Sequence, residues 1–156
     1  MDDELAHLDE RGQARMVDVS AKQATVRTAT AEAYVEMSPE VAARLFAGDL
    51  PKGDALATVR VAAIMAAKRT PELVPLAHPL PVESVTVDIE QVAAGARIVV
   101  TARVTAKTGV EMEAITGAAI GAVSLYDMVK GVDKGVTIGP VRLLAKTGGK
   151  SGEWSR

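Results

Sequence analysis

A single histidine, His78, lies in a proline-rich segment that would hold its side chain in one place. The segment from Leu73 to Pro81 reads LVPLAHPLP, and each proline fixes its own φ angle and biases the preceding residue toward extended geometry. An imidazole titrates near neutrality, so a rigidly held one suits proton transfer or anion binding. The same segment also fits a rigid connector whose histidine only hydrogen-bonds a nearby carbonyl, so other residues must separate the two interpretations.

A second set of residues capable of chemistry lies on a long apolar segment, which we predict to be a helix from about Val110 to Val129. At 100° per residue, one side of this helix carries Glu113, Gly117, Ile120, Gly121, Ser124 and Asp127. Two glycines inside a helix cost about 1 kcal/mol each relative to alanine, which close approach of another backbone or a ligand would offset. Asp127 and Lys130 are spaced i, i+3, which fits either an exposed ion pair worth about 0.2–0.5 kcal/mol or a lysine oriented at a site.

Lysines and glycines near two predicted turns are candidates for binding phosphate. Lys52-Gly53-Asp54 precedes an apolar helix, whose N-terminus favours anions, although no GxxxxGK[ST] pattern is present. The C-terminal region holds Lys146, Gly148, Gly149 and Lys150, a glycine-rich backbone with two lysines that can surround phosphate oxygens. The same region also fits a flexible chain end.

Composition excludes several classes of protein and site. There is no cysteine, which excludes disulfides and thiolate sites, and two histidines alone argue against a zinc site. Lys plus Arg number 18 against 20 Asp plus Glu, and no basic run is interleaved with aromatic residues, which argues against a nucleic-acid partner. No apolar run approaches the ~20 residues of a membrane span and the acidic start is unlike a signal peptide, so we expect a cytoplasmic protein without a membrane partner.

The order of the predicted elements indicates an α+β fold. We predict a disordered N-terminal arm over residues 1–13 and a single catalytic domain over residues 14–156. The predicted elements are a strand at 25–37, a helix at 39–46, a helix at 54–69 that we expect to be well buried, strands at 84–92 and 97–106, the long helix, and a strand at 136–146. With one extra helix set aside, this is the ferredoxin-like βαββαβ order, in which helices pack on one face of an antiparallel sheet.

The small side chains of the predicted core favour an oligomer. Hydrophobic residues make up 48% of the chain but aromatic residues only 3%, so each core side chain buries little area. Packing against another subunit would add to that area.

Six segments carry a resemblance to one protein family. They are MVDVSAK (16–22), KGD (52–54), AAKRTPELVPLAHPLP (66–81), KTGVEMEA (107–114), LYDMVK (125–130) and IGPVRLLAKTGGKSGEW (138–154). Together and in this order, they resemble the molybdenum cofactor biosynthesis protein C family, the cyclic pyranopterin monophosphate synthases. The resemblance implies a lyase that converts 3′,8-cyclo-7,8-dihydroguanosine 5′-triphosphate to cyclic pyranopterin monophosphate and pyrophosphate.

The resemblance also implies roles for particular residues. The family's catalytic aspartate falls on Asp127 and its catalytic lysines on Lys52 and Lys130, as general acid/base candidates with Asp127 orienting or charging Lys130. Its substrate-contacting positions fall on Leu76, Ala77, His78, Met112 and Glu113. Weaker candidates for phosphate contacts are Lys22, Arg27, Lys146 and Lys150.

The resemblance further implies a homo-oligomer, a hexamer built as three dimers with sites across the dimer interfaces. We expect Lys52 to reach a pocket shared with the neighbouring subunit. No cofactor or metal site of the protein is expected, although Mg²⁺ can accompany the substrate triphosphate. Many relatives carry cysteine where this chain has Ala77, so a thiol role at that position is not expected here.

Two other interpretations stay open. A non-catalytic oligomeric nucleotide sensor would use the same lysines but give Asp127 no chemical task. A structural hub with an incidental pocket would need neither Lys52 nor His78.

Overall fold

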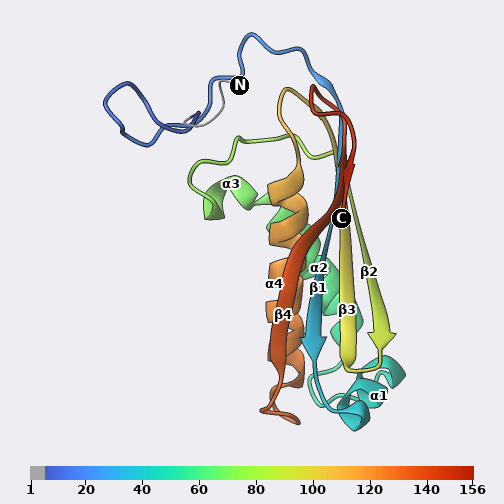
Figure 1. Ribbon diagram of the computed structural model, residues 1–156. Helices are drawn as coiled ribbons and strands as arrows, with labels where there is room; N and C mark the ends of the chain where they lie inside the picture. The colour runs from blue at the N-terminus through green and yellow to red at the C-terminus, as the bar shows by residue number, and fades with distance from the viewer. Residues whose placement is uncertain (1–5) are drawn as a thin grey trace.

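Two layers, a sheet and the helices on one of its faces, make up the described part of the chain, residues 6–156 of a computed structural model (Figure 1). The elements in chain order are β1 (Thr25–Glu36), α1 (Pro39–Ala47), α2 (Ala55–Lys68), α3 (Thr70–Leu73), β2 (Ser84–Val92), β3 (Gly95–Ala106), α4 (Glu111–Val129), β4 (Thr137–Thr147) and β5 (Trp154–Ser155). Helices α2 and α4 run along one face of the sheet, and the opposite face is uncovered.

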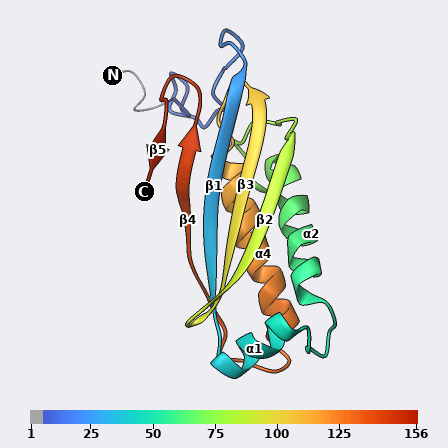
Figure 2. The same ribbon diagram turned by 90° about the vertical axis from the view of Figure 1, so that its right-hand side faces the viewer.

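The sheet is antiparallel and has the strand order β2-β3-β1-β4-β5 (Figure 2). Its first four strands confirm the predicted ferredoxin-like fold with an extra helix. Two short elements were absent from the prediction. Helix α3 is a single turn begun at Thr70-Pro71, and β5 pairs Trp154 with Lys146 at the edge of the sheet.

Side-chain caps explain where the first two helices begin and end. Ser38 Oγ accepts a hydrogen bond from the Val41 amide at the start of α1, and Gly48 ends that helix with φ 74°. Asp54 Oδ1 accepts from the Ala57 amide at 3.0 Å and caps α2. These local signals confirm the helix starts expected from the sequence.

Small residues let α2 and α4 approach each other closely above the sheet. A Cβ atom built on Gly117 would lie 3.2 Å from the carbonyl oxygen of Ala63, and one on Gly121 would lie 3.3 Å from the Ala63 Cβ. The close approach that offsets the two helical glycines is therefore that of another helix. Alternating residues of β1 that include Ala31 and Ala33 complete the core beneath, with no measurable exposure.

The expectation that α2 is well buried was wrong for its outer side. Val61 and Met65 have exposed fractions of 57% and 47%, because a helix on one face of a sheet buries only the side that faces the sheet and its neighbour. On α4, Ile120 and Val123 are exposed as well. By length and composition α4 could cross a membrane, but 56% of its apolar window is buried within this fold, as in the central helix of a globular domain.

The uncovered sheet face holds a buried carboxylate between two arginines. Glu32 on β1 has an exposed fraction of 1% and accepts from Arg97 Nε and Arg142 Nε, each at 2.6 Å. Arg97 also bonds to the exposed Glu90 at 3.1 Å. Burial alone would raise the pKa of Glu32, but the hydrogen bonds from the two arginines outweigh burial and lower it.

The predicted disordered arm, residues 1–13, falls partly outside the described residues, which begin at Ala6. Leu8 pairs with Ala14, and Asp9 Oδ1 accepts from the amides of Arg11 and Gln13 at 2.8 and 2.9 Å. The second half of the arm thus has a local turn, and disorder of the whole arm stays a prediction.

Candidate active site

A cavity of about 540 Å³ opens beside the first turns of α4 and brings together all five substrate-contacting candidates. We call it the larger cavity. The proline-rich segment after α3 passes the start of α4, and the chain before β1 closes the opposite side. The lining residues are Ala6, His7, Val17, Val19, Lys22, Leu76, Ala77, His78, Leu80, Thr108, Gly109, Glu111, Met112 and Glu113.

His78 is held in the wall of this cavity by one hydrogen bond. Its Nε2 lies 2.6 Å from the carbonyl oxygen of Val17. A carbonyl oxygen only accepts, so Nε2 carries the proton, and the Nδ1 of a neutral ring keeps its lone pair. The carbonyl contact allowed by the connector interpretation is therefore present, yet it leaves one nitrogen of a cavity-lining imidazole for a ligand.

Glu113 is a buried carboxyl group in the same cavity, with an exposed fraction of 2%. Burial is the main cause that raises its pKa, and the negative charge of Glu111 adds to it, whereas the Glu113 amide and His78 act in the opposite direction. Such a carboxyl group holds its proton more strongly than an exposed one and can donate a hydrogen bond to a ligand.

A smaller cavity of about 180 Å³ adjoins the larger one and is basic. It is lined by Lys22, Arg27, Thr28, Thr108, Gly109, Glu111, Lys146, Thr147, Gly148 and Ser151, and four of these residues (Lys22, Thr108, Gly109 and Glu111) line both cavities. Three of the four phosphate-contact candidates therefore lie here. Lys150, the fourth, is exposed and does not line either cavity.

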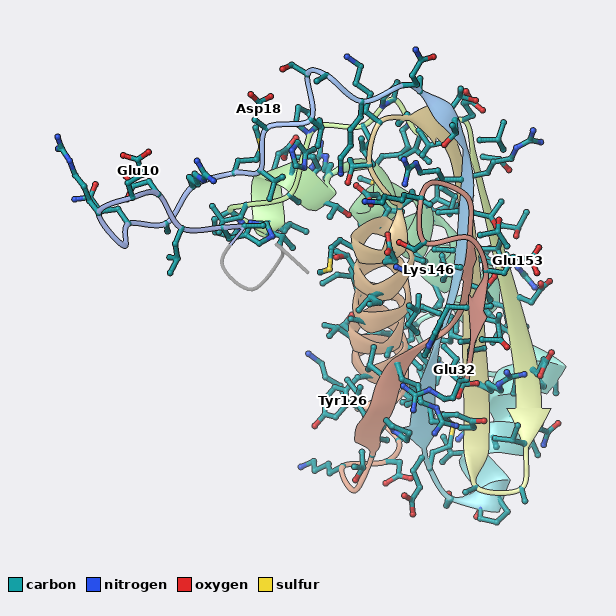
Figure 3. The ribbon with its side chains drawn as sticks, turned by 45° about the horizontal axis from the view of Figure 1, so that its top comes forward. Glu10, Asp18, Glu32, Tyr126, Lys146 and Glu153 are labelled. Atoms are coloured by element: carbon teal, nitrogen blue, oxygen red, sulfur yellow. The ribbon has the colours of Figure 1, made fainter. Side chains whose placement is uncertain are left out.

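Two cations of the smaller cavity are already paired. Lys146 extends from β4 toward the start of α4 (Figure 3) and its Nζ donates to Glu111 Oε1 at 2.8 Å. Burial would raise the pKa of Glu111, but the bond from Lys146 lowers it below its usual value. Arg27 donates to the carbonyls of Ala106 and Lys107, each at 3.2 Å. A phosphate group entering here would meet fixed cations, and it would compete with Glu111 for Lys146.

A second cluster forms where α4 ends. Lys52, in the loop before α2, donates to Asp127 Oδ2 at 2.9 Å, and Lys130 donates to Oδ1 at 2.8 Å. The hydrogen bonds from Lys130 and Lys52 lower the pKa of Asp127 to about 2, and Asp127 in turn raises the pKa of Lys130. The sequence placed Asp127 with Lys130, and the structure adds Lys52 from 75 positions away.

The two groups of candidates do not meet within one chain. Glu113 and Asp127 are 14 positions apart on α4, which at 1.5 Å per residue is about 21 Å. His78, Met112, Lys22 and Lys146 belong to the group at the start of the helix, whereas Lys52 and Lys130 belong to the group at its end.

Several lining residues were missed by the reasoning from sequence. They are Val17, Val19, Thr108, Gly109, Glu111 and Ser151. The signal that could have found them is position, because all lie in the segments 16–22, 107–114 and 138–154 that carry the family resemblance. Among residues 6–156, no group of three or more His, Asp or Glu side chains is placed to hold a metal ion.

Comparison with known proteins finds one family over most of the chain. The model of the MoaC family matches residues 16–149, which include His78, Glu113 at the start of α4 and Asp127 at its end. A protein of Corynebacterium efficiens named cyclic pyranopterin monophosphate synthase is 54% identical over 97% of this chain and 98% of its own length. Proteins of the same name from Geobacter sulfurreducens and Streptomyces avermitilis are 55% and 54% identical, over 96% and 99% of this chain and 95% and 91% of their own lengths. The chain belongs to the MoaC family.

Proposed function

We propose that this protein is a cyclic pyranopterin monophosphate synthase that acts on 3′,8-cyclo-7,8-dihydroguanosine 5′-triphosphate and releases pyrophosphate. The observation that carries the proposal is the pair of joined cavities, one with an imidazole and a protonatable carboxyl group and one with fixed cations. Their shapes and charges suit a ligand with a heterocycle at one end and a triphosphate at the other. Full-length similarity to relatives that carry this name supports the same conclusion.

In this proposal the heterocycle occupies the larger cavity. His78 accepts a hydrogen bond or a proton at Nδ1, and Glu113 donates one from its carboxyl group. Ring opening and re-closure both move protons, so a group that accepts and a group that holds a proton are both needed.

The triphosphate extends into the smaller cavity. A sugar hydroxyl attacks the α-phosphate, the bond to the bridging oxygen of pyrophosphate breaks, and the hydroxyl proton passes to a base. Arg27, Lys22 and Lys146 would stabilise the negative charge that accumulates on the leaving pyrophosphate. Mg²⁺ would enter, if at all, with the triphosphate.

Lys130 fits the role of a proton donor or fixed cation. Its ion pair with Asp127 raises its pKa, so it stays protonated at neutral pH. A neutral lysine base would require this pair to open, which makes Asp127 the group that sets the charge of Lys130.

A second copy of the chain would complete the site. Glu113 and Asp127 lie seven positions on either side of Ile120, and the outer side of α4 near that residue is apolar and exposed. Two α4 helices packed antiparallel about a twofold axis near Ile120 would bring Glu113 of one copy beside Asp127 of its partner. The exposed Val123 and, on α2, Met65 would then be covered. A hexamer of three such dimers, working in the cytoplasm, is our expectation.

The direct test of the function is conversion of the purified substrate. We expect release of one pyrophosphate and one cyclic pyranopterin monophosphate per substrate consumed, and no reaction with GTP, which lacks the 3′,8 bond. Binding of the substrate without any turnover would contradict the enzyme and favour the nucleotide sensor.

The shared site is tested by mixing two inactive variants, one changed in the group at the start of α4 and one in the group at its end. Lys52 and Asp127 are paired within one chain, so variants of these two cannot complement each other. His78→Ala mixed with Asp127→Ala can, since a mixed dimer holds one intact site of two. Random pairing predicts recovery of about a quarter of wild-type activity. No recovery from dimers shown to exchange subunits would contradict a shared site.

A further inference from the structure

Two segments of the chain contact each other beside the larger cavity. The first is Met16–Lys22, and the second is the turn Lys107–Gly109 between β3 and α4. The ammonium group of Lys107 donates to the carbonyl oxygen of Ser20 at 2.9 Å. Thr108 and Gly109 of the same turn line both cavities.

The Met16–Lys22 segment is a turn with few attachments. Asp18 Oδ1 accepts from the Ser20 amide at 2.9 Å, and the Lys22 amide donates to the Val19 carbonyl at 3.1 Å. The Ser20 amide is the main cause of a lowered pKa of Asp18, with Arg15 and Lys107 acting in the same direction at longer range. The turn therefore keeps an ionised acceptor that fixes its shape. Asp18 itself is exposed (Figure 3).

Within residues 6–156, two side-chain hydrogen bonds tie this turn to the rest of the fold. One runs from His78 to the Val17 carbonyl, and the other runs from Lys107 to the Ser20 carbonyl. Without the bond from Lys107, the bond from His78 would be the remaining side-chain hydrogen bond between this turn and the rest of the described fold. The turn could then move with the ring, and the Val17 carbonyl would no longer fix the orientation of His78. The two bonds act on carbonyls three residues apart, so one constrains the other.

We propose that Lys107 is a positioning residue for the reaction: by holding Ser20, it keeps the Val17 carbonyl against His78 and so leaves Nδ1 as the ring nitrogen that faces the substrate. The proposal rests on the proposed function, because it gives that nitrogen a task. A proton taken from the substrate by Nδ1 gives an imidazolium whose Nε2–H is still accepted by Val17. The same proton returns to the substrate in a later step, so the ring ends as it began.

The tautomer of His78 can be measured directly by nuclear magnetic resonance, with long-range ¹H–¹⁵N correlations. The chain has two histidines, so the His78→Asn variant identifies the His78 signal as the one that is lost. At about pH 8, we expect the wild-type ring to carry its proton on Nε2, which lies 2.6 Å from the Val17 carbonyl oxygen. The measurement is made without substrate.

Variants of Lys107 test the positioning role. Lys107→Met keeps most of the side chain but loses the donor, and we expect a mixture of the two His78 tautomers and kcat/KM lower by about 10- to 100-fold. Lys107→Arg restores a donor and should recover both properties at least in part. Lys134→Met, at an exposed lysine that follows α4 and lines neither cavity, is the matched control and should change neither property.

Two results would overturn the proposal. One is a wild-type His78 with its proton on Nδ1, which decides the matter even if the Lys107 variants do not fold. The other is a folded Lys107→Met protein with wild-type tautomer and kcat/KM. A wild-type protein with the expected tautomer but no turnover would instead contradict the proposed function, so the two failures are distinguishable.

Discussion

Lys52 and Lys130 bind the same carboxylate, that of Asp127, each through a different oxygen atom, at 2.9 and 2.8 Å. The three side chains come from a loop, the end of α4 and the residue directly after it. One carboxylate between two ammonium groups leaves the cluster with a net positive charge, which suits a partner site that binds phosphate. Removal of the carboxylate should therefore leave binding intact but lower the pKa of Lys130, which Asp127 raises.

Asp127→Asn is expected to lower kcat by about 10²–10⁴-fold, the usual contribution of acid–base groups. The pKa of Asp127 is about 2, so the wild-type carboxylate is ionised throughout the range in which the enzyme would work. Substrate affinity, measured by calorimetry, should change little. Asp88→Asn, at an exposed aspartate on β2, is the control. Wild-type kcat in Asp127→Asn would show that Asp127 has no part in the chemistry.

Lys146→Met should weaken the binding of inorganic pyrophosphate by about tenfold, because a charge-assisted contact is lost. Glu111→Gln should strengthen it, since the Glu111 carboxylate, 2.8 Å from Lys146 Nζ, competes with pyrophosphate for that lysine. Isothermal titration calorimetry measures both, with Lys134→Met as the reference. Equal pyrophosphate affinity in all three variants would contradict a phosphate site in the smaller cavity.

Glu32→Gln should lower the free energy of unfolding by about 2–3 kcal/mol, near the lower end for loss of one partner of a buried ion pair, because both arginines are partly exposed. Glu90→Gln removes a carboxylate from the same network, but Glu90 is exposed, so its loss should cost about 0–1 kcal/mol. Denaturant unfolding compares the two. Equal losses of unfolding free energy in the two variants would show that the burial of Glu32 does not increase its contribution to stability.

Glu113→Gln should stabilise the protein at neutral pH but not in acid. The folded-state pKa of Glu113 is raised above its usual value of 4.5, so as pH rises the unfolded chain loses this proton first. The wild-type protein therefore loses stability between the two pKa values, and the glutamine variant does not. Unfolding free energies from about pH 4 to pH 8 should show a difference between the two proteins that grows with pH.

The outcome for Glu113 depends on the comparison between proteins rather than on either curve alone. Glu32 and Glu111 have lowered pKa values and add stability as pH rises through the acid range, in both proteins. Glu153→Gln, at an exposed carboxylate on the C-terminal segment, is a suitable control. A constant difference at all pH values would contradict a raised pKa.

Elements whose signals are local were predictable from the sequence. The caps Ser38 and Asp54 and the terminator Gly48 act within four residues, so α1 and α2 were expected within a residue or two of where they lie. The exposure of Val61 and Met65 was not predictable, because a helix with apolar residues on all sides does not say which side meets the sheet. The two-residue strand β5 depends on its partner strand rather than on its own sequence.

The site was predictable in its parts but not in its arrangement. The prolines around His78 predicted that its ring would be held in place. The carbonyl that binds the ring belongs to Val17, 61 positions earlier, and only the fold brings the two together. The pairing of Lys52 with Asp127 spans 75 positions in the same way. The periodicity of α4 put Glu113 and Asp127 on one side of the helix and near its two ends, but it did not show which side chains gather around each carboxylate.

The number of residues in α4 between Glu113 and Asp127 fixes both the distance and the angle between their side chains. If two copies pair about Ile120, Glu113 of one copy lies beside Asp127 of the other only while each stays seven positions from Ile120. One inserted residue would turn the far end by about 100° and advance it by about 1.5 Å, so Asp127 would face away from the partner's cavity. An insertion or deletion inside α4 should therefore abolish function even where the sheet still forms.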